Sequence, residues 1–150
     1  SAEMGLYDRL RAQFPTLKAV NVIGGLGTYV SLQQRVPGEG KQAGLVAVAT
    51  DNYAKTAIVV DDDVDIYNER EVAWAINTRM VADRDLLIMP GVKGAHLDPV
   101  SYNEARTGRG PMTTRLVIDA TRHVETEFEK KIEPDSELWQ KIDLREYLKS

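Results

Sequence analysis

The sequence predicts an α/β fold, a three-layer α/β/α sandwich with a mixed sheet, plus an extended C-terminal helix. Short β-branched runs alternate with longer amphipathic segments through the middle of the chain, which is typical of helices packed on the faces of a sheet. An apolar run that leads into a glycine-rich turn indicates an opening hairpin, and this antiparallel pair makes the sheet mixed. The length of 150 residues and the hydrophobic fraction of 43% suit a single domain over residues 1–150.

The first half of the chain predicts a helix, two hairpin strands and a second helix, over residues 3–14, 19–23, 29–35 and 41–53. Leu6 and Leu10 lie on the same face of the first helix, and Pro15 ends it because proline cannot continue the backbone hydrogen bonds. Gly24–Gly27 is the turn between the two hairpin strands. The second helix is rich in Ala, Leu and Val, so we expect one of its faces to be buried.

The second half predicts a strand, a helix, two strands and a terminal helix, over residues 57–60, 68–80, 86–89, 116–118 and 135–148. Asn68 is the expected N-cap of the first helix, and Glu69 and Glu71 favour its first turn through the helix dipole. The strand–helix–strand unit that begins at residue 57 predicts a right-handed crossover between parallel strands. Residues 91–113 contain many Gly and Pro residues and predict a long loop.

The composition excludes several classes of site. The chain has no cysteine, which removes disulfides, thiolate metal sites and a cysteine nucleophile, and its two histidines are too few for a typical His-based zinc site. The net charge of -4 argues against broad nucleic-acid binding. No apolar run approaches the roughly 20 residues that span a bilayer, and no signal-peptide pattern opens the chain. We therefore expect a cytoplasmic protein with no nucleic-acid or membrane partner.

Four carboxylates follow the strand over residues 57–60, at Asp61, Asp62, Asp63 and Asp65. Like charges this close raise one another's pKa, so the cluster needs a counter-charge or hydrogen bonds. A hard cation such as Mg²⁺ would supply the counter-charge, which makes Asp62, Asp63 and Asp65 candidate metal ligands. The alternative interpretation is structural, with some carboxylates capping turn and helix N–H groups and others facing water.

Three further features have both a functional and a structural interpretation. Gly24–Gly27 could cradle a phosphate, but it lacks the dinucleotide and P-loop patterns, and the sequence favours a tight turn between two strands. His96 could act as an acid–base group, but no partner for it is visible in the sequence. Five arginines could contact an anionic ligand or simply face solvent, and these are Arg79, Arg84, Arg106, Arg109 and Arg115.

Several motifs follow one another in a fixed order, namely Phe14–Val20, Val59–Asp65, Glu71–Ala75, Thr78–Arg79, Asp83–Asp85, Pro90–Gly91, Leu97–Pro99, Ile118–Thr121 and Glu137–Trp139. In this order and spacing they resemble the C-terminal domain of UbiD-type decarboxylases. The resemblance covers nearly the whole chain. It rests on the series of motifs together, because no single one of them is decisive.

The resemblance implies a reversible, non-oxidative decarboxylase of aromatic or α,β-unsaturated acids. Such enzymes use prenylated FMN, with a divalent metal and potassium at its phosphate. Their catalytic Glu–Arg–Glu set and metal ligands precede this domain, so the resemblance implies no catalytic residue here and no cofactor bound by this chain alone. It implies a flavin-binding catalytic portion as partner, a cleft that this domain closes, and a homo- or hetero-oligomer supported by the terminal helix over 135–148.

One departure from the family concerns cofactor contact. Some members place a lysine near the flavin phosphate, shortly before the strand that leads to the Asp cluster. Ala49 occupies the nearest counterpart, and Lys41 and Lys55 are the neighbouring candidates for a cofactor-binding role.

Three hypotheses about function follow from these observations. The chain is the C-terminal domain, or a separate small subunit, of a UbiD-like decarboxylase or carboxylase. Alternatively, it is a Mg²⁺-dependent phosphoryl-transfer domain that uses the Asp61–Asp65 cluster. A third hypothesis is a non-catalytic regulatory or scaffold subunit with this fold, because a fold alone does not determine function.

Overall fold

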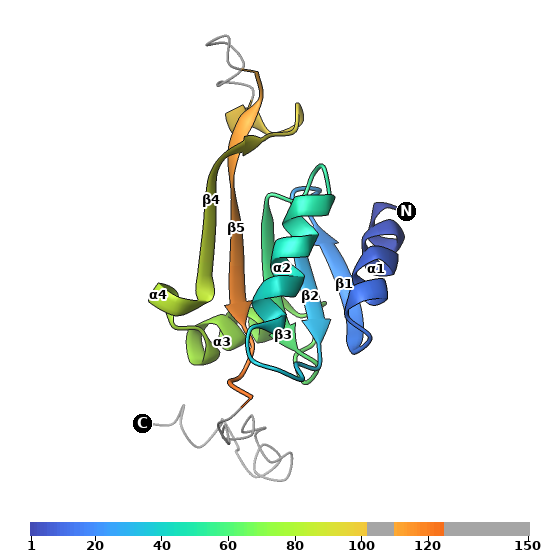
Figure 1. Ribbon diagram of the computed structural model, residues 1–150, viewed down its shortest axis with the longest axis vertical. Helices are drawn as coiled ribbons and strands as arrows, with labels where there is room; N and C mark the ends of the chain where they lie inside the picture. The colour runs from blue at the N-terminus through green and yellow to red at the C-terminus, as the bar shows by residue number, and fades with distance from the viewer. Residues whose placement is uncertain (102–109, 125–150) are drawn as a thin grey trace, which may run out of the picture.

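The computed structural model describes residues 1–101 and 110–124, which form a mixed five-stranded sheet with helices on both faces (Figure 1). The strands are β1 (Leu17–Ile23), β2 (Gly27–Leu32), β3 (Thr56–Asp61), β4 (Leu86–Lys93) and β5 (Met112–Ala120). The helices are α1 (Ala2–Gln13), α2 (Glu39–Thr50), α3 (Glu69–Arg79) and the short α4 (Ala82–Asp85). The predicted α/β sandwich is confirmed, while the predicted terminal helix over 135–148 lies outside the described residues.

The strand order is β1-β2-β3-β5-β4. β2, β3 and β5 are parallel, and β1 and β4 lie antiparallel to their neighbours at the two sides of the sheet. The opening hairpin is therefore confirmed, with Gly24 and Gly25 at positive φ in its turn. We call the end at which β2, β3 and β5 terminate the carboxyl end of the sheet, and the opposite end the amino end.

The two faces of the sheet are covered unequally. Helices α1 and α2 cover one face through a core that includes Leu6, Leu10, Leu17, Val30, Val48, Val59 and Val117. On the other face α3 packs near the carboxyl end, in a smaller core of Val60, Val64, Ile66, Val72, Ala75 and Ala120. In the part of the chain that the structure describes, no helix is long and apolar enough to cross a membrane.

Helix α2 approaches the sheet closely because small residues face it. A Cβ added to Gly44 would lie 2.3 Å from Cγ1 of Val117, so the helix axis could not stay in place with a larger residue there. Ala43 and Ala47 on the same helix are also fully buried. The buried face predicted from the content of Ala, Leu and Val is confirmed, and its Gly and Ala residues set the distance between helix and sheet.

The predicted parallel crossover after β3 is wrong. The strand after α3, β4, runs antiparallel to β5 and hence to β3, and the parallel partner of β3 is β5. The guanidinium of Arg79, the last residue of α3, bonds to Asp61 at the end of β3 and to Asp63 just beyond it. Because α3 ends at the same end of the sheet as β3, the next strand starts there and runs back.

The long loop predicted over residues 91–113 is shorter than expected. β4 continues to Lys93 through an irregularity between Met89 and Val92, and β5 begins at Met112. Gly91, at φ 70°, provides the backbone conformation that lets the strand pass Pro90. Residues 99–101 are helical, and 102–109 lie outside the described residues.

Candidate functional site

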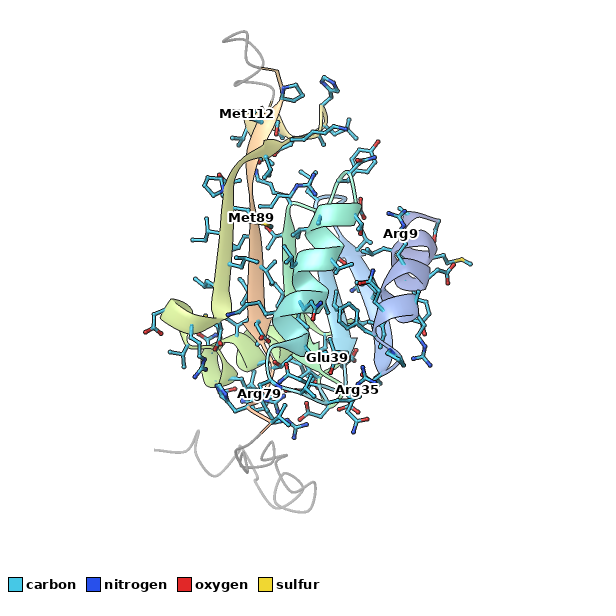
Figure 2. All side chains as sticks on the ribbon, in the orientation of Figure 1. Arg9, Arg35, Glu39, Arg79, Met89 and Met112 are labelled. Carbon is cyan, nitrogen blue, oxygen red and sulfur yellow. The ribbon has the colours of Figure 1, made fainter. Side chains whose placement is uncertain are left out.

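Two members of the acidic cluster at the carboxyl end form a buried ion-pair network with one arginine. The Nη1 of Arg79 donates to Oδ2 of Asp61 and to Oδ1 of Asp63, both at 2.8 Å, and its Nη2 donates to Asp63 at 2.7 Å. The Arg79 side chain is 1% exposed, and its guanidinium lies 4.8 Å from the centroid of the Trp74 ring. Figure 2 shows Arg79 at the carboxyl end of the sheet. Arginine thus supplies the counter-charge for which the sequence had suggested a metal.

The pKa values of the two carboxylates in this network are shifted in opposite directions. Burial raises the pKa of Asp61, although the backbone N–H of Arg122 and the charges of Arg122 and Arg79 oppose the rise. The hydrogen bonds from Arg79 lower the pKa of Asp63, which is more exposed. Among the described side chains, the Nε of Arg79 is buried without a hydrogen-bond partner, so part of the guanidinium is stabilised only by Trp74 and its charge partners.

The remaining acidic residues order the turn into α3. Asp65 accepts a bond from the backbone N–H of Tyr67 at 2.9 Å, and the N–H of Asp65 donates to Glu71 at 2.9 Å. Asn68 caps the helix by accepting from the N–H of Arg70, as predicted. Asp62 contributes its carbonyl, which accepts from Lys18 at 2.6 Å.

The candidate metal ligands do share one place in the fold. Asp62, Asp63 and Asp65, with Glu71, line a hollow of about 300 Å³ beside β1 and β2. Within residues 1–101 and 110–124, however, no three acidic or histidine side chains are arranged to hold a metal ion. Because Asp63 is bound by Arg79, this geometry supports the structural interpretation of the cluster.

A second hollow of about 200 Å³ lies at the carboxyl end beside the start of α2. The carbonyl oxygen of the Gln34 side chain accepts from the N–H of Gly40 at 2.8 Å and from the hydroxyl of Thr121 at 3.2 Å. The backbone N–H of Thr121 donates to Asp119 at 3.1 Å, and burial raises the pKa of Asp119. Lys41 lines this hollow and donates to the carbonyl of Arg84.

The amino end is closed by a second set of buried polar contacts. Asp98 forms an ion pair with Lys55 at 3.0 Å and accepts bonds from the hydroxyls of Ser101 at 3.1 Å and Thr113 at 3.2 Å. Burial alone would raise the pKa of Asp98, but the bonds from Lys55, Ser101 and a backbone N–H outweigh it and lower that pKa. These contacts fix residues 94–101, which we call the latch loop.

Arg115 fills the space beside the latch loop. Its guanidinium donates to the carbonyls of five residues, which are Val48, Asp51, Asn52, Ala54 and Lys93. Three of them lie at or just after the last turn of α2, where carbonyls have no partner within the helix. The hollow that remains there is only about 10 Å³.

The two lysines suggested for cofactor contact lie at opposite ends of α2. Lys41 is in its first turn, at the carboxyl end, whereas Lys55 follows it at the amino end and is bound to Asp98. Ala49 is in the last turn of α2, on the side of Lys55. One site therefore cannot use both lysines.

The interpretation of the arginines as solvent-facing is wrong for two of them. Arg79 and Arg115 are buried, and both occupy positions that pattern analysis could have found. Arg79 continues the buried face of α3 after Val72 and Ala75, and Arg115 lies on the same buried face of β5 as Val117. His96 and Leu97 are exposed on the latch loop, Leu97 at 75%.

Known proteins share this architecture. Residues 1–120 match the model of the 3-octaprenyl-4-hydroxybenzoate carboxy-lyase C-terminal domain. An anhydromevalonate phosphate decarboxylase of Methanothermobacter thermautotrophicus is 32% identical over 79% of this chain, which spans 28% of that relative. The UbiD-class enzyme HmfF from Pelotomaculum thermopropionicum, in complex with FMN, superposes with a TM-score of 0.78 at 29% identity, over 97% of this chain and 32% of that one.

A further solved relative is the vanillic acid decarboxylase of Sedimentibacter hydroxybenzoicus, known in an open and a closed form. Both forms superpose with a TM-score of 0.74 over 99% of this chain, at 32% and 31% identity, and over 33% and 32% of that enzyme's chain. The chain thus spans about a third or less of each of these relatives. It belongs to the UbiD family and corresponds to its C-terminal domain.

Proposed function

We propose that this chain is the C-terminal domain, or a small subunit, of a non-oxidative decarboxylase or carboxylase of aromatic or α,β-unsaturated acids. The observation that carries the proposal is the match over residues 1–120 to a domain that relatives carry as a minor part of longer decarboxylase chains. The flavin-binding portion of the enzyme would hold prenylated FMN, a divalent metal and potassium. This chain would close the cleft and support the oligomer.

The amino end is the surface that we assign to the cleft. Ala49, the counterpart of the lysine that some members place near the flavin phosphate, lies at this end of α2. The latch loop displays Leu97, which is 75% exposed, on a backbone held by the buried Asp98. An exposed apolar side chain on an immobilised loop can bind a partner with little loss of conformational entropy.

A domain that closes a cleft has to move relative to the portion it covers. This chain matches about a third of the Sedimentibacter enzyme's chain, and that enzyme is known in an open and a closed form. The two forms support such a movement for the enzyme that contains this chain. The Lys55–Asp98 pair and Arg115 would keep the latch loop rigid during it. Closure would then move the loop with the domain as one body.

The test combines this chain with the flavin-binding portion of its own enzyme, loaded with prenylated FMN. Association is measured by sedimentation and turnover by exchange of labelled CO₂ into the carboxylate. Leu97→Asp should weaken association or turnover about tenfold or more, because it places a charge in an apolar contact. The matched control is Val36→Asp, at a position 58% exposed beyond the other end of the sheet, and it should leave both unchanged.

The outcomes separate the competing functions. If the chain does not associate with the flavin-binding portion and does not affect turnover, the proposal is wrong. Association without any effect on turnover would instead identify a scaffold subunit. Equal effects of the two aspartate variants would contradict the assignment of the amino end to the cleft.

A further inference from the structure

Two segments that are far apart in the chain meet at the amino end of the sheet. One is residues 51–55, between α2 and β3, which we call the connector, and the other is the latch loop. Both line the same small hollow, the connector through Tyr53 and the latch loop through Asp98. Each also displays an apolar side chain to solvent, Tyr53 at 49% and Leu97 at 75% exposure. The amino end therefore presents two apolar contacts whose separation depends on how the segments are joined.

A single guanidinium bridges the connector and the latch loop. The Nη2 of Arg115 donates to the carbonyl of Asn52 at 3.3 Å and to the carbonyl of Lys93, immediately before the latch loop, at 3.2 Å. The Nη1 of the same side chain donates to the carbonyls of Asp51 at 2.7 Å and Ala54 at 2.9 Å, near the two ends of the connector. Because each η nitrogen carries two hydrogens, Nη2 uses both of its donors to join the two segments.

Capping of α2 explains only part of this arrangement. The last turn of α2, residues 47–50, is made of neutral residues, and Arg115 supplies the positive charge that favours a helix C-terminus. A lysine would supply the same charge. The bond to Lys93, however, lies outside this helix, and donating to carbonyls of both segments at once requires the planar fork of an arginine.

A second and more exposed link joins the same two segments. The Nζ of Lys55, in the connector, lies 3.0 Å from Oδ2 of Asp98, in the latch loop, and 31% of the Lys55 side chain is exposed. Arg115 is buried, at 8% exposure. Solvent screens the partly exposed pair, whereas removal of the buried guanidinium leaves several carbonyls without a donor. Arg115 is therefore the stronger of the two links.

We propose that Arg115 is a positioning residue that holds the connector and the latch loop together as one contact surface for the flavin-binding portion. This inference rests on the proposed function, which assigns the amino end to the cleft. Because one guanidinium bonds to both segments, Tyr53 and Leu97 keep a fixed separation when the domain closes. A surface that is ordered before contact loses less conformational entropy on binding than two independent loops would.

Amide hydrogen exchange of the full chain tests the coupling of the two segments. The reporters are hydrogen-bonded backbone N–H groups, of Tyr53 in the connector and of Gly94 and Asp98 in the latch loop. Arg115→Lys keeps the charge but not the fork, so exchange should become about tenfold or more faster in both segments. Lys55→Ala should accelerate exchange in the latch loop and leave that of Tyr53 unchanged, because Arg115 still holds the connector.

The matched control is Arg79→Lys, which makes the same change at a buried arginine at the carboxyl end. It should lower the free energy of unfolding without accelerating local exchange in the connector or the latch loop. Arg115→Ala adds a rescue test. Guanidinium ions, at concentrations far below those that unfold the protein, should slow its exchange in both segments again, whereas sodium ions should not. Equal circular dichroism spectra establish that the variants fold.

Association with the flavin-binding portion, measured by sedimentation, tests the role of the joined surface. Arg115→Lys should weaken association about tenfold, and Arg79→Lys should leave it unchanged. Faster exchange in only one segment, or faster exchange in both without weaker association, overturns the proposal. If Leu97→Asp weakens association but Arg115→Lys does not, the proposed function stands and this inference fails. If neither variant weakens association, the assignment of the amino end to the cleft is wrong as well.

Discussion

The two ends of the sheet both bury a carboxylate, but the ion pairs that do so have different surroundings. Each end buries a carboxylate against a basic side chain, Asp61 against Arg79 at the carboxyl end and Asp98 against Lys55 at the amino end. At the carboxyl end hollows of about 300 and 200 Å³ lie around the ion pairs, whereas the hollow beside Lys55, Asp98 and Arg115 at the amino end has a volume of about 10 Å³. At the carboxyl end the ion pairs between Asp61, Asp63 and Arg79 connect β3 to α3. At the amino end the ion pair between Asp98 and Lys55 holds the latch loop in place.

Under the proposed assignment of the amino end to the cleft, a concentration of charge in the sequence does not locate the functional surface. The four carboxylates over Asp61–Asp65 attract attention first, yet three of them, Asp61, Asp63 and Asp65, have arginine side chains and backbone N–H groups as partners. The single Asp98 immobilises the loop that displays Leu97. What a carboxylate does depends on its partners, and the partners depend on the tertiary fold.

Removing Arg79 should have the largest effect on stability. Arg79→Ala leaves Asp61 and Asp63 without their shared counter-ion, and breaking a buried pair in this way costs about 3–5 kcal/mol. Chemical denaturation measures the change in the free energy of unfolding. The control is Arg70→Ala on the exposed side of the same helix, for which we expect a change within about 0.5 kcal/mol. A loss below that level for Arg79→Ala would mean that the carboxyl end is not held by this network.

A methyl group at Gly94 should disturb the amino end alone. A Cβ there would lie 2.1 Å from Oγ of Ser101, so either the latch loop or its bond to Asp98 has to shift. We expect Gly94→Ala to cost about 1–3 kcal/mol, as overpacking usually does. Thermal unfolding compares it with Gly5→Ala on α1, where the added Cβ meets nothing closer than 3.6 Å.

The control substitution should act in the opposite direction. Alanine is a better helix former than glycine, so Gly5→Ala should stabilise the protein by about 0.5–1 kcal/mol. If both alanine variants stabilise it, the latch loop is more adaptable than its contacts indicate. The proposed rigid closure would then lose its structural basis.

The elements that were predicted correctly are those that local chemistry determines. The Asn68 cap follows from its side chain, and the hairpin follows from the glycines at positive φ. The length of β4 was missed because Pro90–Gly91 normally ends a strand, and here a local irregularity carries the strand past it. Such compensation depends on β5 as a pairing partner, which the sequence does not reveal.

The site was harder to predict than the fold, for a related reason. The direction of β4 depends on the bond between Arg79 and Asp61, which are 18 positions apart in the chain. The filling of the amino end depends on Arg115 reaching carbonyls such as that of Asp51, 64 positions away. Periodicity shows that such a side chain points inward, but it does not identify its partner.

The sign of the pH dependence of stability also separates the two ends of the sheet. The pKa of Asp98 is lowered in the folded protein, so its contribution to stability is present above the ordinary value of 3.8 and is lost as the pH falls. The pKa of Asp119, at the carboxyl end, is raised by burial, so its contribution is present at low pH and is lost as the pH rises through the folded-state pKa.

Urea denaturation of the wild type, Asp98→Asn and Asp119→Asn between pH 7 and pH 3 measures both signs. At pH 7 the free energy of unfolding of the wild type should be about 1–3 kcal/mol higher than that of Asp98→Asn, and this difference should shrink as the pH falls. The difference between the wild type and Asp119→Asn should instead grow as the pH falls, because the protonated carboxyl no longer has the cost of a buried charge. Opposite slopes of the stability difference against pH require that folding stabilises the anionic form of Asp98 and the protonated form of Asp119. If the two differences instead change with pH in the same direction, the two ends of the sheet do not differ electrostatically.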